Sequence, residues 1–336
     1  MSRRGKALLL ICLAAVVIVA AYGGYRTTRG ASTTEAIAAV AAWGNEHPSF
    51  DRIYFRYNGS DANFGRLTYV DSSDMSKIGF AGALACESVY VAGGRGICLV
   101  ADRGMVTKYS AKIFDAVSYA TLFEIPLYGV PSRSRVSRDG RLAASTVFVA
   151  GHGYASVDFS TQTLLIDTTT GKVLADLESF RVMRDGQSIQ GNDFNFWGVT
   201  FTPDSKGFYA TLSTGREHLL VRGNIEARTA EVVHQNVECP SLSPDARHLA
   251  FKQRLTSNGA VVWQLHVLDL QTMQATALAE RGSIDDQLEW LDNSHVLYAV
   301  ASGGRSPSTT LWMVGIDGSR EPVPFLPNAY SPAVVR

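Results

Sequence analysis

The stretch CPSLSPDARHLAFK, residues 239–252, predicts a short strand, a tight Ser-Pro-Asp turn and a second strand. Proline presets φ for such a turn, and an aspartate there can hydrogen-bond the backbone two residues further on. Weaker copies stand at residues 136–140 (VSRDG), 201–205 (FTPDS) and 290–294 (WLDNS). A turn that recurs at this interval between β-type runs is typical of a β-propeller.

A second landmark allows the blades to be counted. Six apolar runs end in an aspartate or asparagine before a polar turn, at Asp71, Asp115, Asp167, Asn224, Asp269 and Asp317. The successive separations are 44, 52, 57, 45 and 48 residues, which is the size of a four-stranded blade. We interpret each landmark as the end of the third strand of a blade, and the sequence therefore predicts six blades.

The Ser-Pro-Asp turns then fall between the first and second strands of their blades, and Gly93-Gly94 takes the same position in one further blade. No first strand precedes Ile53, but residues 329–335 (AYSPAVV) have the pattern of one. We predict an all-β, six-bladed β-propeller over residues 51–336, with the C-terminal strand closing the first blade. Closure protects blade edges that would otherwise be templates for aggregation. A two-sheet sandwich, the alternative, fits six evenly spaced units poorly.

The N-terminal residues 1–24 differ from the rest of the chain. Arg3, Arg4 and Lys6 precede an uncharged, apolar run at residues 7–24, which is about the shortest length that crosses a bilayer. Flanking basic residues keep such an end in the cytoplasm. We expect a transmembrane helix that acts as a signal anchor in the cell membrane and places the propeller on the extracytoplasmic side. A cleaved signal peptide, giving a secreted or periplasmic protein, is the alternative.

Residues 25–50 are expected to form a juxtamembrane linker. Ser32 or Thr33 can cap a short helix that continues through the alanine-rich residues 36–43.

Export also determines how the cysteines are interpreted, because disulfides persist in oxidising compartments. Cys86 and Cys98 flank a predicted hairpin and are the candidate disulfide, with two free buried thiols as the alternative.

Composition and motifs limit the possible functions. Lys and Arg together number 31, as do Asp and Glu, so the net charge is zero. That balance argues against a nucleic-acid partner, which requires a basic surface. The sequence contains no Gly-x-Ser-x-Gly, HExxH or phosphate-binding loop. We therefore expect no catalytic, cofactor or metal site, and no enzymatic activity.

Several polar residues are candidate metal ligands. His248 and His295 occupy equivalent turn positions in successive blades, and Asp102 and Asp285-Asp286 could offer oxygen ligands to a metal ion. We interpret them instead as turn and solvated loop residues. The inner strands at residues 199–201 and 240–242 carry few acidic or histidine side chains, which favours a binding module over an enzyme.

The densest polar and aromatic run is NDFNFW, residues 192–197. It enters the first strand of a blade after a long loop, and loops of this kind often contact ligands. Asn192, Asp193, Phe194 and Trp197 are therefore candidates for recognition at the rim of the propeller, with core packing of the aromatic residues as the alternative.

The segments PSLSPDA (240–246) and LHVLD (265–269) resemble the repeat of the TolB-like, WD40-like (PD40-type) β-propellers of bacterial envelope proteins. The resemblance covers about residues 50–336. In TolB an α/β domain precedes the propeller, and the propeller binds a partner protein at its channel mouth. This chain lacks room for that domain. The resemblance implies a protein-binding or scaffold module of the cell envelope whose partner is another envelope protein. A small-molecule or metal-dependent, lactonase-like enzyme with its site at the channel mouth is the alternative.

Overall fold

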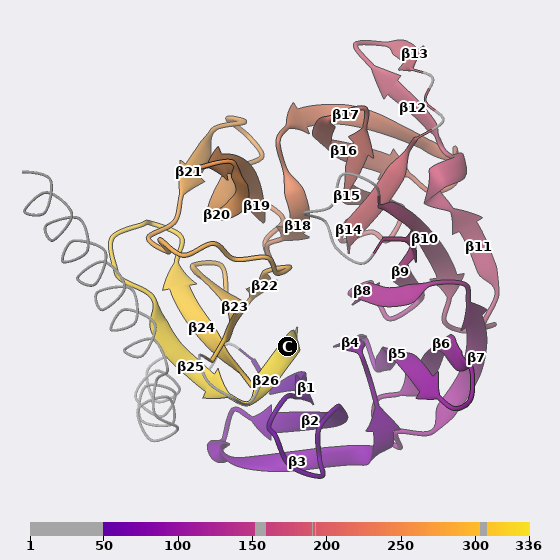
Figure 1. Cartoon of the computed structure of the whole chain (residues 1–336), viewed down its shortest axis with the longest axis vertical. Helices are drawn as coiled ribbons and strands as arrows, with labels where there is room; N and C mark the ends of the chain where they lie inside the picture. Colours follow the sequence, from indigo (N-terminus) through magenta and orange to yellow (C-terminus); the bar gives the residue numbers. More distant parts are fainter. Residues whose placement is uncertain (1–49, 152–158, 190, 192, 303–307) are drawn as a thin grey trace, which may run out of the picture.

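A computed structural model describes residues 50–151, 159–189, 191, 193–302 and 308–336. In this part of the chain, strands β1–β26 form six sheets set around a central axis (Figure 1). The predicted all-β, six-bladed propeller is confirmed. Each blade is described below from the axis outward.

The first three blades are regular sheets of four antiparallel strands. The first blade comprises β26 (Ala329–Val335), β1 (Arg52–Tyr57), β2 (Arg66–Asp71) and β3 (Asp74–Ala85). The second comprises β4 (Ser88–Ala92), β5 (Arg95–Arg103), β6 (Thr107–Asp115) and β7 (Thr121–Leu127). The third comprises β8 (Val130–Val136), β9 (Leu142–Ala150), β10 (Ser160–Asp167) and β11 (Val173–Asp176).

The last three blades follow the same order. The fourth comprises β14 (Asn195–Phe201), β15 (Gly207–Thr214), β16 (Glu217–Asn224) and β17 (Thr229–Gln235). The fifth comprises β18 (Glu238–Leu242), β19 (His248–Ser257), β20 (Ala260–Asp269) and β21 (Ala275–Ala277). The sixth comprises β22 (Glu289–Trp290), β23 (His295–Ala301), β24 (Thr309–Gly315) and β25 (Val323–Pro327).

The landmarks used to count the blades lie where they were expected. Five of them are the last residues of third strands, namely Asp71, Asp115, Asp167, Asn224 and Asp269, and Asp317 follows β24 by two residues. The C-terminal strand β26 pairs antiparallel with β1, from Arg52 opposite Val335 to Tyr57 opposite Ala329. Strands from the two ends of the propeller sequence therefore share one sheet.

The fourth blade carries an insertion where the sequence predicts a long loop. After a short 3-10 helix (Leu177–Ser179), β12 (Arg181–Arg184) runs parallel to β17 and pairs with β13 (Gln187–Ile189). The sheet thereby grows to six strands, and the added hairpin stands at the outside of the ring (Figure 1). Glu178 anchors the insertion, because its carboxylate accepts hydrogen bonds from the backbone N–H of Thr163 at 2.8 Å and of Phe196 at 3.0 Å.

The hydrophobic core lies between neighbouring blades. Ile53 and Phe55 of the first blade pack with Leu297 of the sixth, and Ile97 of the second packs with Ala143 of the third. Because each sheet is buried on both faces, strands do not need a strict alternation of apolar and polar residues. The approach is closest between Gly93 and Gly140, two turn glycines with positive φ, where an added Cβ would lie 2.3 Å from the backbone of the other turn.

The predicted membrane helix at residues 7–24 and the predicted linker helix at residues 36–43 fall outside the residues that the structure describes. Within the described residues, none of the helices has the length and apolar character needed to cross a membrane.

Candidate functional site

The axial channel opens at the end of the propeller that carries the turns between first and second strands, which we call the turn face. The opposite end carries the hairpins between second and third strands and is called the hairpin face. At the turn face the channel widens into a cavity of ≈ 410 Å³, the mouth, whose walls include Val136, Phe201, Leu242 and Trp290. The exposed side chains of Arg138 and Arg336 line its edge.

The floor of the mouth is an ion pair that crosses the axis. Arg135 of β8 and Glu289 of β22 come from opposite blades, and the Arg135 Nη1 atom donates to Glu289 Oε2. Both side chains are about 95% buried, with exposed fractions of 6% and 5%. The second Arg135 amino group donates to Ser241 Oγ at 3.2 Å. A buried pair with this many hydrogen bonds fixes the geometry of the blades around it.

Residues of two further blades donate hydrogen bonds to the Glu289 carboxylate. The Tyr90 hydroxyl of β4 donates to Glu289 Oε1 at 3.0 Å, and the Val334 backbone N–H of β26 donates to it at 3.3 Å. The Arg135 guanidinium also lies over the Tyr90 ring, 4.4 Å from the centroid. Burial raises the pKa of Tyr90 to about 12, so the phenol stays a donor at neutral pH. Residues of five blades thus meet at Glu289 and Arg135.

A second layer lies deeper in the channel. Arg133 Nη1 donates to the Tyr330 hydroxyl at 2.9 Å and lies 3.6 Å from Asp286 Oδ1. Asp286 accepts backbone hydrogen bonds from Gln287 and Ala299, both at 2.9 Å. A pocket of only ≈ 20 Å³ separates this layer from the one above. Side chains therefore fill most of the space between these two layers.

A third group of charges lies beside the second layer. The Lys252 ammonium is fully buried, contacts Asp285 Oδ1, and lies 4.6 Å from the centroid of the Trp263 ring. Glu238 is also fully buried, 3.5 Å from Arg254 and 3.9 Å from Lys252. Burial raises the pKa of Glu238, whereas for Asp285 the nearby Lys252 and Arg133 outweigh burial and lower the pKa.

This arrangement corrects two interpretations made from the sequence. Residues 199–201 and 240–242 have no acidic or histidine side chains, but other inner-strand positions do, because β18 supplies Glu238 and β22 supplies Glu289, each paired with an arginine. Asp286 is not a solvated loop carboxylate, since it is 4% exposed, whereas the Asp285 side chain is 40% exposed in its loop and binds Lys252. The alternating SRSR at residues 132–135 was the available signal, because it places two arginines on the same side of an inner strand.

Four carboxylates and four cations thus form ion pairs in and beside the channel: Glu238, Asp285, Asp286 and Glu289 with Arg133, Arg135, Lys252 and Arg254. The described residues hold no group of three or more His, Cys, Asp or Glu side chains placed to bind a metal ion. His295 pairs with Asp292 at 3.0 Å, His248 lies 3.8 Å from Asp269, and Asp102 is exposed.

The candidate rim residues do not form one surface. Asn192 is not among the residues described. Asp193 is exposed and accepts a hydrogen bond from Thr214 Oγ1 at 2.7 Å, and Phe194 packs at the edge of the core between the third and fourth blades. Trp197 is fully buried beside Phe148 and cannot serve as a rim contact. For Trp197 the alternative, core packing, is correct, because its side chain fills the space between blades.

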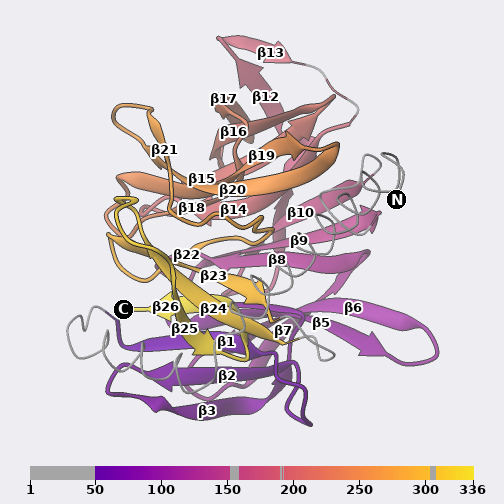
Figure 2. The same cartoon turned by 60° about the vertical axis from the view of Figure 1, so that its left-hand side comes forward.

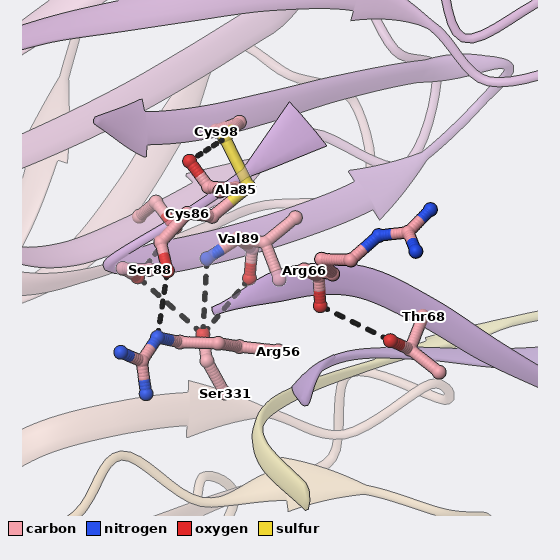
Figure 3. Close-up of a disulfide and its surroundings, with 10 residues drawn as sticks. Arg56, Arg66, Thr68, Ala85, Cys86, Ser88, Val89, Cys98 and Ser331 are labelled. Carbon is pink, nitrogen blue, oxygen red and sulfur yellow. Dashed lines mark hydrogen bonds between the residues drawn. A yellow bond between two sulfur atoms is a disulfide. The ribbon is translucent and has the colours of Figure 1, made fainter. Parts of the chain in front are cut away.

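The candidate disulfide joins the first two blades. Cys86 and Cys98 are bonded, with their Cα atoms 5.3 Å apart (Figure 3). The Cys86 carbonyl accepts a hydrogen bond from Arg56 Nε at 2.6 Å, and the neighbouring Ser331 Oγ donates to the Val89 carbonyl at 2.9 Å (Figure 3). Since Ser331 belongs to β26 and Val89 to β4, the bridge stands where the closing strand meets the second blade. The third cysteine of the propeller, Cys239, is free and buried.

No family model and no curated protein matches the chain. Among solved structures, TolB from Acinetobacter baumannii superimposes with a TM-score of 0.59 at 16% identity, covering 90% of this chain and 72% of that one. Putative TolB from Agrobacterium tumefaciens gives 0.50 at 11% identity, covering 82% and 88%. A chain of the nidogen/laminin complex gives 0.52 at 10% identity, covering 85% and 98%. At these identities the likeness concerns the fold, and the fold of this chain is that of a TolB-like, six-bladed β-propeller.

Proposed function

We propose that the chain is an extracytoplasmic scaffold of the bacterial cell envelope that binds a segment of another envelope protein in the mouth at the turn face. The likeness in fold to TolB supports the choice of an envelope module. The mouth supports the choice of a protein ligand, because it is large enough for a few side chains and is bounded by both apolar walls and arginines.

The observation that carries this proposal is the closed floor. The ionisable groups below the mouth are held by one another, and Glu289 alone accepts hydrogen bonds from Arg135, Tyr90 and Val334. A carboxylate that is already paired is poorly placed to act on a substrate, since catalytic acids and bases must be free to exchange protons. The paired charges instead form a rigid base against which a docked segment can rest.

The edge of the mouth indicates the chemistry of the partner. Arg138 and Arg336 add two positive charges there, and each donates to one backbone carbonyl, of Pro244 and Trp290 respectively. A guanidinium has five N–H donors, so both retain donors for a ligand. A partner segment with apolar side chains and an acidic group would fill the walls and meet these arginines.

In this proposal, residues 7–24 anchor the chain in the cell membrane and residues 25–50 tether the propeller on the extracytoplasmic side. The first described residues of the propeller, Phe50 and Asp51, stand at the turn face, because β1 starts there. The tether therefore reaches the propeller at the same face as the mouth. If the leader is cleaved instead, the mouth is unchanged and the propeller is free of the membrane.

Photo-crosslinking in cells tests the proposal. A photoreactive amino acid at Pro203, an exposed mouth residue, should capture a discrete envelope protein. The same group at Val323, exposed on an outer strand, is the matched control and should not capture it.

Charge reversal provides the second arm of this test. Arg138→Glu together with Arg336→Glu should abolish the crosslink, whereas Arg141→Glu should leave it intact. Arg141 is also exposed, lies in the same turn as Arg138 and does not line the mouth. Equal crosslinking from both positions, or a crosslink that survives reversal of both mouth arginines, would rule out the mouth as the binding site.

A further inference from the structure

The hairpin of the second blade ends in an exposed apolar tip. Met105 and Val106, which connect β5 to β6, have exposed fractions of 107% and 74%. Figure 2 shows this hairpin projecting beyond the neighbouring blades. Two adjacent apolar residues fully in water at the end of a projecting hairpin are unfavourable unless another surface covers them.

An apolar groove lies next to the tip. It has a volume of ≈ 810 Å³ and is lined by side chains of the second and third blades, including Tyr109, Leu127, Tyr128, Val130 and Phe148. Tyr128 is 79% exposed, and Val149 at the groove's edge is 47% exposed. Asp102 and Thr107, on either side of the tip, also line this groove. Tip and groove are therefore parts of one continuous surface at the hairpin face.

We propose that this surface binds a second copy of the chain, with the tip of each copy inserted into the groove of the other. A twofold interface requires one patch that is complementary to itself. A projecting apolar tip beside an apolar groove meets that requirement, because a twofold rotation brings each tip to the other groove. The groove volume of ≈ 810 Å³ exceeds what a methionine and a valine side chain fill, and the aromatic rings beside them supply the kind of contact that dominates protein interfaces.

The charges around the groove favour a protein over a lipid membrane as its binding partner. Asp102, Lys108 and Glu124 all border it, so the edge carries both signs. In a twofold pair, lysine of one copy can face a carboxylate of the other. An anionic bilayer would attract Lys108 but repel Asp102, and Glu124 is already paired with Lys112 at 3.9 Å. A surface built for lipid would be expected to carry an excess of basic residues.

The dimer and the mouth occupy opposite ends of the propeller. Pairing through the hairpin face leaves both turn faces open, so the dimer presents two mouths. Two linked sites raise the apparent affinity for a clustered partner without any new contact. The dimer does not depend on the proposed binding at the mouth, and its test is separate.

Sedimentation velocity of the full chain in detergent tests the proposal. We expect a dimer that Val149→Arg, or Met105→Ser with Val106→Ser, weakens by roughly tenfold or more. Val117→Ser is the matched control, because Val117 is 85% exposed but lies in a turn at the turn face. It should dimerise like the unaltered chain. Thermal unfolding of each variant shows that loss of the dimer is not loss of the fold.

Crosslinking separates this interface from pairing through the N-terminal apolar run. In a Cys12→Ser background, which removes the cysteine of the N-terminal run, copies with Val106→Cys and copies with Val149→Cys carry different tags. A short bismaleimide should join one to the other. The native cysteines of the propeller do not compete, because Cys86 and Cys98 are bonded and Cys239 is buried. A monomeric chain, a dimer unaffected by Val149→Arg, or no crosslink between the two tags would overturn the proposal. The proposal would also be overturned if the chain is monomeric and binds vesicles containing anionic lipid, and the tip variant loses that binding. That result would assign the tip to a membrane.

Discussion

The hydrogen bonds of Ser243 show which residues the recurring Ser-Pro-Asp turn depends on. Its hydroxyl donates to Asp245 at 2.6 Å and accepts from the backbone N–H of His248 at 3.0 Å. Ser137 and Thr202 make the same pair of contacts in their turns, with 2.6 Å to the aspartate in each case. The turn at Ser137 has arginine where the others have proline. The hydroxyl and the aspartate are therefore the shared elements of the turn, and the proline is an addition.

This comparison leads to a prediction about two neighbouring substitutions. Ser243→Ala should lower the free energy of unfolding by about 1–2 kcal/mol, because it leaves the partly buried backbone N–H of His248 without its acceptor. Pro244→Ala should lower it by less than about 1 kcal/mol, since only the entropy of the unfolded chain changes. Urea unfolding monitored by tryptophan fluorescence measures both. A larger loss for Pro244→Ala than for Ser243→Ala would contradict the role assigned to the hydroxyl.

His218 makes the stability of the propeller depend on pH. Burial, together with the nearby Arg254 and Lys252, lowers its pKa from 6.5 to about 4. The folded state therefore holds the imidazole neutral at pH values where the unfolded chain binds a proton. The stabilisation is complete above pH 6.5 and is lost as the pH falls toward 4. The fully buried Glu238, 3.9 Å away, has a raised pKa and so opposes part of this trend.

His218→Gln should accordingly flatten the pH dependence of unfolding between pH 6.5 and 4. We expect the unaltered chain to lose about 1–2 kcal/mol more than the variant over this range, after allowance for the partial exposure of the ring. Urea titrations at several pH values measure the difference. Parallel curves for the two proteins would show that His218 is not the group that titrates.

At the scale of the element, the disulfide constrains the connection between β3 and β5. Cys86 and Cys98 are 12 residues apart, and in the chain-entropy model a loop of this size stabilises by about 3 kcal/mol. Replacement of both by alanine should lower the free energy of unfolding by about that amount, and dithiothreitol should lower that of the native chain similarly. Mass spectrometry before and after alkylation measures the bond directly. A chain that alkylates fully without reductant would contradict the pairing.

Local patterns predicted the fold well, and contacts between distant blades were not predictable from them. The strand-ending Asp269 and the turn at Ser243 depend on residues within a few positions, so repetition makes them visible. The Arg135–Glu289 pair joins residues 154 positions apart, and neither residue has a sequence signature of its own. The β12–β13 hairpin was missed because QSI and RVMR are too short and too polar to show a strand period.

At the scale of the whole molecule, two devices hold the ring together. The Glu289 carboxylate and the Arg135 guanidinium connect residues of five blades at the axis. The β26–β1 pairing joins the two ends of the propeller sequence within the first blade. The two are linked, because Val334 of β26 donates its backbone N–H to Glu289 while its side chain packs between the first and sixth blades.

Removal of residues 329–336 should therefore disrupt both devices at once. The truncated chain loses the inner strand of the first blade and one donor to Glu289, and it exposes the edge of β1 to other chains. We expect it to aggregate or to lose the cooperative unfolding transition, and a peptide of residues 329–336 added during refolding should restore that transition by pairing with β1. Deletion of Arg336 alone, beyond the strand, should change the free energy of unfolding by no more than about 0.5 kcal/mol. A truncated chain that unfolds as cooperatively as the full one would show that the ring does not depend on its closing strand.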